Sequence, residues 1–232
     1  FQDSVLSEFI LNSDIAKILR GHGIEVKAVI DPRNFSLLEQ DLPDLCADRL
    51  DYSLRHLLMP KHLAPLRPFE VLQYVAVDEG KFVMTSPIIA WKYARAFSQW
   101  YQKELADIRC IAAFQILADA IKRALEKDIL TRADLFEDDA YVMEKLKKSG
   151  DPHIIQLISV LTPEFDCVID KVHPDLTSGV KNRYIDPRVR LGNGTTLRVS
   201  EIYPDFAKEL ADQKARFDHQ KFPIRITSTA LR

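Results

Sequence analysis

The sequence has few cysteines, no long apolar run and no phosphate-binding loop, and each absence excludes a class of protein. Its three cysteines, Cys46, Cys110 and Cys167, are widely spaced and form no CxxC pair or Cys/His zinc pattern. No uninterrupted apolar run approaches the ~18–20 residues that a membrane-spanning helix needs. The chain also lacks a glycine-rich phosphate loop and a GxSxG nucleophile motif. We therefore expect no membrane partner and a reduced, cytoplasmic compartment.

The charge balance is close to neutral, which bears on the kind of partner. The 232 residues include 32 Lys and Arg and 34 Asp and Glu, a formal net charge of −2. The sequence pI is about 6.3, so no overall positive charge attracts nucleic acid or an anionic membrane surface. With 47% hydrophobic and 28% charged residues, the composition is typical of a globular protein. A chain of this length can form one large or two small domains.

The first residues of the chain, FQDSVLSEFIL, contain neither an initiator methionine nor a signal-peptide pattern. Apolar residues already recur at helical spacing at Val5, Leu6, Phe9 and Ile10. Such a start is typical of a chain that begins within a structural element. Either the protein is processed or the sequence is part of a longer protein, and we expect it to be part of a longer protein.

Helical spacing dominates the first two-thirds of the sequence. Predicted helices cover residues 2–11, 13–20, 43–58, 67–74, 87–104, 108–128, 138–148 and 152–161. Asp78-Glu79-Gly80 lies between two short β-rich runs and predicts a hairpin, since glycine readily adopts a positive φ. After Pro163 the sequence becomes β-rich, with a further helix predicted at 200–217 and a closing strand. We predict a mainly α fold, with a helical body at 1–163 and a small α+β appendage at 164–232.

The segment LPDLCADRLDYSLRHLL, residues 42–58, concentrates ionisable groups within a few helical turns. Residues three, four and seven apart are neighbours on a helix, so one face carries Asp48, Asp51, Tyr52 and Arg55. Asp51 and Arg55 can pair, whereas Asp48 has a tyrosine four residues later. An unpaired carboxylate is suited to bind a divalent metal, with a neighbouring arginine receiving an anion. The same pattern also fits a solvated helix face with one ion pair.

The stretch LCADRLDYSLRHLL resembles a segment of the HD-superfamily phosphohydrolases that is usually written D-x-D-R-x-D-Y-x-x-R-D. The resemblance is strongest to the branch of deoxynucleoside triphosphate triphosphohydrolases. It implies an HD-type helical domain and a divalent metal ion, which could be Zn, Mn, Fe, Mg or Ni. Asp48 would be the last ligand of the family's His/His-Asp/Asp metal site. Arg49 would contact substrate phosphate, and Tyr52 would lie against the nucleotide sugar.

The sequence departs from the family pattern in and around the same helix. His56 stands where the family usually has an aspartate that binds the sugar hydroxyl, and Cys46 and Ala47 replace the first acidic residue and its neighbour. His56 and Arg55 are still predicted to contact substrate. No His-Asp dipeptide occurs in the 232 residues, and one carboxylate cannot hold a catalytic metal alone. Either the other ligands precede Phe1 in a longer protein, or the chain is a degenerate relative without catalysis.

The resemblance covers most of the chain, although only the motif at 42–58 is specific. The other similar segments are FQDSVLSEFILNSDIAKIL, ILTRADLFEDDAYVMEKL and KNRYIDPRV with the following LRVSEIYPDFAKEL. Tyr101 resembles, by position, a substrate-side tyrosine of the triphosphohydrolases. In an extended strand, Lys181 and Arg183 would project to one side and could contact an anion or an allosteric nucleotide. A charged, solvated strand edge is the alternative for these two residues.

The resemblance predicts a metal-dependent phosphohydrolase that acts on a nucleotide or a related phosphate ester. The expected partner is a phosphorylated small molecule, not nucleic acid, and the expected assembly is a homo-oligomer. The alternative is a catalytically silent HD-like scaffold that binds a nucleotide or a protein partner. A third interpretation is a helical interaction domain without a ligand, in which Asp48 faces solvent and pairs only with a local base.

Overall fold

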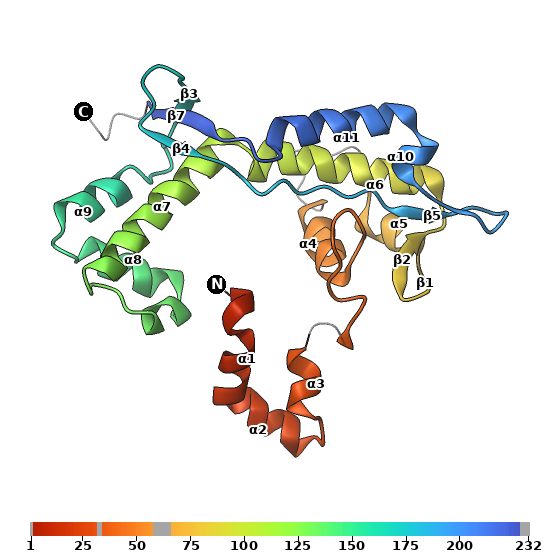
Figure 1. Ribbon diagram of the computed structural model, residues 1–232, viewed down its shortest axis with the longest axis horizontal. Helices are drawn as coiled ribbons and strands as arrows, with labels where there is room; N and C mark the ends of the chain where they lie inside the picture. Colours follow the sequence, from red (N-terminus) through yellow and green to blue (C-terminus); the bar gives the residue numbers. More distant parts are fainter. Residues whose placement is uncertain (1, 32–33, 58–65, 228–232) are drawn as a thin grey trace. The chain divides into compact units, whose positions relative to one another are not determined.

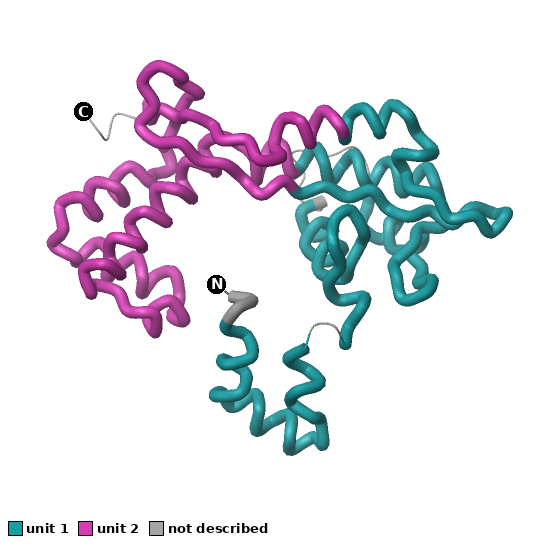
Figure 2. Tube along the Cα trace, in the orientation of Figure 1, with its two compact units in different colours: residues 1–100, 183–210 teal, residues 101–182, 211–232 magenta. Residues whose placement is uncertain are grey.

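The computed structural model describes residues 2–31, 34–57 and 66–227. The chain forms two compact units, which Figure 2 distinguishes by colour. Unit 1 comprises Phe1–Trp100 and Arg183–Leu210, and unit 2 comprises Tyr101–Asn182 and Ala211–Arg232. The fold is mainly helical with one small sheet in each unit, which confirms the predicted fold class at this level. None of the helices in the described part is long and apolar enough to cross a membrane.

Three short helices form the N-terminal part of unit 1 (Figure 1), namely α1 (Gln2–Asn12), α2 (Asp14–Gly21) and α3 (Val26–Ile30). Their small core consists of Ile10, Ala16 and Val26. The Ser13 hydroxyl accepts a hydrogen bond from the amide two residues later at 3.3 Å, which is the role of an N-cap. The helices predicted at 2–11 and 13–20 are therefore confirmed to within one residue.

A four-stranded sheet organises the rest of unit 1, in the order β1-β2-β5-β6. Its strands are β1 (Val75–Asp78), β2 (Lys81–Met84), β5 (Arg188–Arg190) and β6 (Thr196–Arg198). Glu79 and Gly80 have positive φ angles of 47° and 72°, as a two-residue type I′ turn requires. The predicted hairpin is thus confirmed. Strand β5 pairs with β2 in parallel, through Met84 and Val189, and so joins the C-terminal region to this hairpin.

The helices of unit 1 outside the N-terminal part are α4 (Ala47–Leu57), α5 (Pro68–Leu72), α6 (Pro87–Trp100), α10 (Val199–Ile202) and the first half of α11 (Pro204–Phe217). Helix α6 contacts α4, α5 and α10. The prediction that placed Pro43 in the first turn of α4 is wrong, because the helix begins at Ala47. The Pro43 carbonyl instead accepts a hydrogen bond from the Asp186 amide at 3.0 Å. The predicted end near Leu58 lies outside the described residues.

Unit 2 combines helices with a three-stranded antiparallel sheet of order β3-β7-β4. Its helices are η2 (Tyr101–Leu105), α7 (Ile108–Glu126), η3 (Ala133–Phe136), α8 (Asp139–Lys147), α9 (Pro152–Ser159) and the second half of α11. The strands are β3 (Cys167–Ile169), β4 (Leu176–Ser178) and β7 (Phe222–Ile226). The helices enclose a core of Ala120, Ala124, Leu130, Leu146, Ile154 and Ile158.

Two of the predicted long helices are divided in the structure. The helix predicted at 87–104 is α-helical as far as Trp100 and continues as the π-helix η2. The helix predicted at 200–217 is interrupted at Tyr203, between α10 and α11. The interruption follows from Pro204, because proline lacks an amide hydrogen and is accommodated only in the first turn of a new helix.

The compact units follow a different division from the predicted helical body at 1–163 and appendage at 164–232. Strands β5 and β6 pair with the β1-β2 hairpin in unit 1, whereas β7 pairs with β3 and β4 in unit 2. The C-terminal region is therefore shared between the units. Strand partners that are distant in sequence decided this division.

Candidate functional site around helix α4

Asp48 lies in the first turn of α4 and is exposed to solvent. A carboxylate at this end of a helix interacts favourably with the partial positive charge of the unpaired amides. Within the described ranges, no group of three or more His, Cys, Asp or Glu side chains is placed to hold a metal ion. Asp48 is thus a single candidate ligand, and the described residues do not by themselves form the predicted metal site. Its exposure also agrees with the interpretation of α4 as part of an interaction domain.

Arg49, the predicted phosphate contact, is buried and bound to the segment that precedes α4. Its Nη1 donates to the Asp44 carbonyl at 2.8 Å, and its Nη2 pairs with Glu39 Oε1 at 3.0 Å. Only 10% of the Arg49 side chain is exposed. The guanidinium therefore holds the chain before α4 in place, and a contact with phosphate stays a prediction.

Tyr52 lies one turn after Asp48 and packs against two aromatic rings of α6. Its ring centroid is 6.1 Å from that of Phe97 and 5.9 Å from that of Trp100. The hydroxyl oxygen is fully buried and makes no hydrogen bond of acceptable geometry with any described residue. Burial raises the pKa of Tyr52, and the nearby guanidinium groups of Arg183 and Arg49 oppose that rise. A buried hydroxyl without a partner is unusual and calls for an explanation.

The last turns of α4 carry the other two residues predicted to bind substrate. Arg55 pairs with Asp51 at 3.0 Å, and both side chains are largely exposed, which confirms the predicted pair four residues apart. The His56 ring stacks on Trp100, with centroids 4.4 Å apart and planes inclined by 22°. His56, Tyr52 and Trp100 therefore form one aromatic group on the side of α4 that faces α6. Trp100 and Phe97 both belong to the buried core.

Tyr101 is fully buried within unit 2. Its hydroxyl donates to the Lys181 carbonyl at 3.2 Å, and its ring meets Phe217 edge to face at a centroid distance of 5.6 Å. These contacts give Tyr101 a packing role in unit 2. Its predicted contact with substrate stays a prediction.

Lys181 and Arg183 do not lie in a strand, because the chain has no regular structure between Gly179 and Pro187. The strand predicted over these two residues is therefore wrong, and a contact of either residue with an anion stays a prediction. Lys181 is exposed and belongs to unit 2, whereas Arg183 is half-buried and belongs to unit 1. Within unit 1, Arg183 lies near Tyr52.

Asp44 is a buried carboxylate that sequence reasoning missed. It pairs with Arg198 at 2.8 Å and with Arg188 and Lys81 at 3.3 Å each. Burial raises the pKa of Asp44, but the hydrogen bond and charge of Arg198, with Arg188 and Lys81, outweigh it and lower the pKa. This carboxylate joins the segment before α4 to β2, β5 and β6. No sequence signal reveals it, since its partners come from three separate strands.

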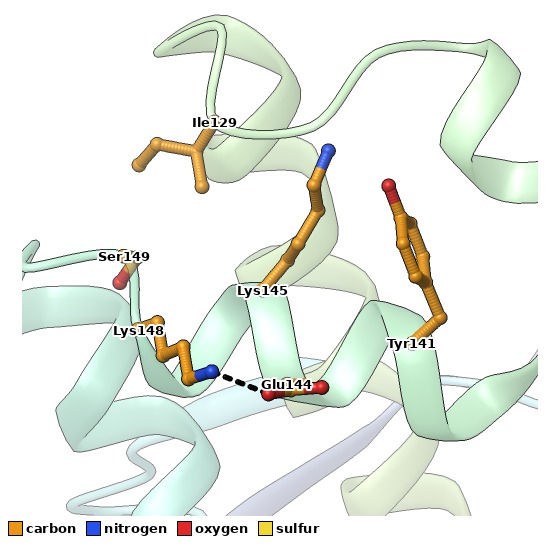
Figure 3. A pocket seen from close by; sticks show the side chains of 6 residues that line it. All are labelled: Ile129, Tyr141, Glu144, Lys145, Lys148 and Ser149. Atoms are coloured by element: carbon orange, nitrogen blue, oxygen red, sulfur yellow. Dashed lines mark hydrogen bonds and ion pairs between the residues drawn. The ribbon is translucent and has the colours of Figure 1, made fainter.

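A separate pocket of about 400 Å³ lies in unit 2 (Figure 3), lined by Ile129, Tyr141, Glu144, Lys145, Lys148 and Ser149. Both of its lysines have acidic partners. Lys148 pairs with Glu144, and Lys145 lies 2.7 Å from the buried Asp134. The Asp134 carboxylate also accepts hydrogen bonds from Thr131 and Tyr141. The lysine charges are therefore compensated within the protein, and the pocket is not an evident anion site.

Comparison with known proteins leaves the family open. No family model matches the chain. The chain is 29% identical over 196 residues to the uncharacterized protein YdhJ of Bacillus subtilis (strain 168). The match covers 82% of this chain and 59% of the relative, so the chain spans 59% of the length of the curated relative. The name of that relative states no activity, and the resemblance to the HD superfamily remains a prediction.

Proposed function

We propose that the chain is the C-terminal part of a metal-dependent phosphohydrolase of the HD superfamily, with an HD-like helical body. Its substrate would be a nucleotide or a related phosphate ester. The observation that carries the proposal is the arrangement on α4: an exposed carboxylate, Asp48, lies one turn before Tyr52. The Tyr52 hydroxyl is buried and has no partner in the described part of the chain. A ligand that binds beside α4 would complete both groups.

The proposal assigns to this chain one metal ligand and a set of substrate contacts. A divalent ion in such an enzyme polarises phosphate and lowers the pKa of a bound water. Asp48 alone does not fit a metal ion, because such sites need three or more protein ligands. The other ligands would have to come from residues outside the described part, and we assign no reaction step to the ion.

The substrate side of the proposal rests on the aromatic group of α4 and α6. Tyr52 and His56 both pack on Trp100, and flat rings of this kind can lie against a sugar or a base. His56 provides a ring nitrogen where the family usually has a carboxylate, so contacts with the sugar hydroxyl would differ from those of the triphosphohydrolases. A cytoplasmic homo-oligomer that binds a phosphorylated small molecule is part of the same proposal.

The proposal is tested with the complete gene product purified without chelators. Metal content is measured by mass spectrometry, and phosphate release is measured with a panel of nucleotides and phosphate esters. Asp48→Asn should lose both the bound metal and the hydrolysis. Asp51→Asn is the matched control, because it removes the same charge from an exposed position of the same helix, and it should retain the metal.

The second candidate is a catalytically silent HD-like scaffold that binds a nucleotide or a protein partner. It is favoured by one observation, namely that within the described residues Asp48 has no cluster of ligands around it. Absence of metal and of hydrolysis in the complete gene product, together with saturable nucleotide binding, would support this candidate and exclude the enzyme.

A further inference from the structure

A second pocket of unit 2, with a volume of about 410 Å³, is lined by residues of η2, α7, β3, α11 and β7 and is mainly apolar. Its lining includes the buried side chains of Ala106, Ile111 and Phe217. Ile108 and Phe222 also line it, and both pack on the core cluster that contains Ile111. Because these side chains belong to a packed core, the fold itself holds the floor of the pocket in place.

Strand β3 adds exposed apolar side chains to this pocket. Val168 and Ile169 line it, although their side chains are 40% and 54% exposed. Strand β3 lies at the edge of the three-stranded sheet. Exposed apolar side chains beside a pocket are typical of a surface that binds a ligand. An apolar group bound here would remove both side chains from water.

Two charged side chains line the pocket, and they differ in their partners. Asp107 pairs with the Arg109 guanidinium at 3.1 Å and accepts a hydrogen bond from the Arg109 amide at 2.9 Å. The Arg216 guanidinium lies 5.0 Å from the centre of the Phe217 ring. Over the part of the chain that the structure describes, no carboxylate pairs with Arg216. The pocket therefore presents one positive charge that the described residues do not compensate.

Arg216 can bind an anion without losing its contact with Phe217. A cation–π contact is an attraction between the charge and the face of the ring, so it needs none of the five N–H donors of the guanidinium. Arg216 is also exposed, and an anion can reach it from solvent. Arg49 differs in both respects, because it is buried and its terminal nitrogens already donate to Asp44 and Glu39.

We propose that this pocket binds a small monocarboxylate whose apolar part is a medium-chain acyl group. The carboxylate accepts paired hydrogen bonds from Arg216, and the chain lies against Ile111, Phe217 and Val168. One uncompensated cation favours a single negative charge on the ligand, and the carboxylate of Asp107 in the same lining disfavours a second. The inference concerns unit 2 alone and goes beyond the proposed phosphohydrolase, on which it does not depend.

The pocket beside Tyr141 is less suited to an anion of this kind. Its two lysines, Lys145 and Lys148, have acidic partners in Asp134 and Glu144. An anion bound there would have to compete with carboxylates of the protein. At Arg216 the described residues offer no such competitor.

The test is calorimetric titration of the complete gene product with octanoate, hexanoate, 1-octanol and octyl phosphate. Octanoate should bind saturably. Hexanoate should bind about tenfold more weakly, because two fewer methylene groups are buried. 1-Octanol has the same chain without the charge, and it should bind at least about tenfold more weakly than octanoate. Octyl phosphate should bind no more tightly than octanoate.

The role of the charge is tested with Arg216→Gln. This variant should weaken octanoate binding by at least about tenfold and change 1-octanol binding by less than about twofold. Arg132→Gln is the matched control, since Arg132 is an exposed arginine of the same unit at the N-cap of η3. It should change the affinity for octanoate by less than about twofold.

The role of the apolar wall is tested with Val168→Thr, which keeps the shape of the side chain but replaces a methyl group by a hydroxyl. It should weaken the binding of octanoate and of 1-octanol by at least about threefold. Val172→Thr, the same change at a side chain that is 77% exposed, should leave both affinities within about twofold of wild type. Thermal unfolding of every variant is measured alongside.

The inference is overturned if octanoate shows no saturable binding, or if Arg216→Gln binds octanoate as tightly as Arg132→Gln. Equal losses of octanoate and 1-octanol binding in Arg216→Gln would also overturn it, because the arginine would then maintain the pocket without recognising the charge. Tighter binding of octyl phosphate would assign the site to a phosphate monoester and overturn the monocarboxylate. None of these outcomes bears on hydrolysis or on metal binding through Asp48, so the proposed function fails or stands separately.

Discussion

Asp44 and Arg198 form the shortest ion pair at the start of α4, with Arg198 Nη2 2.8 Å from Asp44 Oδ1. Arg198 also donates from Nη1 to the Asp186 carbonyl at 2.8 Å. One guanidinium thus joins the segment before α4 to the segment that precedes β5. Asp44 and Arg198 therefore hold the segment before α4 against the segment that contains Asp186.

Replacement of Asp44 by asparagine should destabilise the protein by about 1–3 kcal/mol. The side chain of Asp44 is 11% exposed, while those of its three cationic partners are 26–42% exposed. Because the cations can recover part of their hydration, the loss should fall below that of a fully buried pair. Urea-induced unfolding of wild type and Asp44→Asn measures this loss of stability. Asp78→Asn, at an exposed pair, should change stability by less than about 0.5 kcal/mol, and an equal loss in both variants would contradict the role of Asp44.

Protonation of the Asp151 carboxylate in unit 2 should contribute to the loss of stability at acidic pH. Hydrogen bonds from Arg123 lower the pKa of Asp151 to about 2, with the amides of Ile154 and His153 contributing. The pKa of Asp151 in the folded protein is below the ordinary value of 3.8. The contribution of ionised Asp151 to the free energy of unfolding is therefore complete above pH 3.8 and is lost as pH falls toward 2.

The Asp151 contribution is isolated by comparing unfolding free energies of variants between pH 5 and pH 2. Asp151→Asn should show a shallower decline than wild type over this range, because the variant has no carboxylate to protonate at this position. Asp128→Asn, at an exposed turn residue of the same unit, serves as the control. Identical slopes for Asp151→Asn and wild type would show that Asp151 is not tied to Arg123 in solution.

Leu146 should be the most sensitive position in the helical core of unit 2. It is completely buried among Ala120, Leu130 and Ile154, so Leu146→Ala leaves a cavity that the neighbouring small residues cannot fill. The expected loss is about 2–5 kcal/mol, measured by chemical denaturation. Val172→Ala, at a side chain that is 77% exposed, should stay within about 0.5 kcal/mol of wild type. A loss below about 1 kcal/mol at Leu146 would mean that this core is loosely packed.

His56→Asp should increase the preference for a nucleotide that carries the sugar hydroxyl over one that lacks it, provided that the proposed phosphohydrolase activity is present. A carboxylate at this position can accept a hydrogen bond from the sugar, as the resemblance implies for the family. The ratio of kcat/KM for a nucleotide over its 3′-deoxy analogue should rise by about tenfold, the value of one hydrogen bond of ~1.4 kcal/mol. An unchanged ratio in a folded variant would place His56 away from the sugar.

Local sequence signals predicted the elements whose structure depends on near neighbours. The hairpin at Glu79-Gly80 follows from a glycine that adopts positive φ. The pair of Asp51 and Arg55 follows from helical spacing. The same reasoning failed at Pro43, which precedes the start of α4 and whose carbonyl accepts a hydrogen bond from the amide of Asp186, a residue distant in sequence.

In the candidate site, too, the sequence predicted only the features that depend on residues close together in the chain. Asp48 and Tyr52 share a helix, so their spacing places them one turn apart whatever surrounds them. Arg49 could not be predicted to be buried, since Glu39 and the Asp44 carbonyl are brought to it by the fold of the preceding segment. Arg183 could be paired with Lys181 only by assuming a strand that does not form.

The amino-acid sequence by itself determined the mainly helical character of this protein, its hairpin and the order of groups along α4. Tertiary structure alone decided that the Asp44 carboxylate is surrounded by cations and that Arg49 is buried against Glu39 and the Asp44 carbonyl. The physical reason is the distance along the chain over which each kind of interaction acts. Helical spacing and turn geometry act over a few residues, whereas ion pairs and burial depend on strands such as β2, β5 and β6 that meet only when the chain has folded.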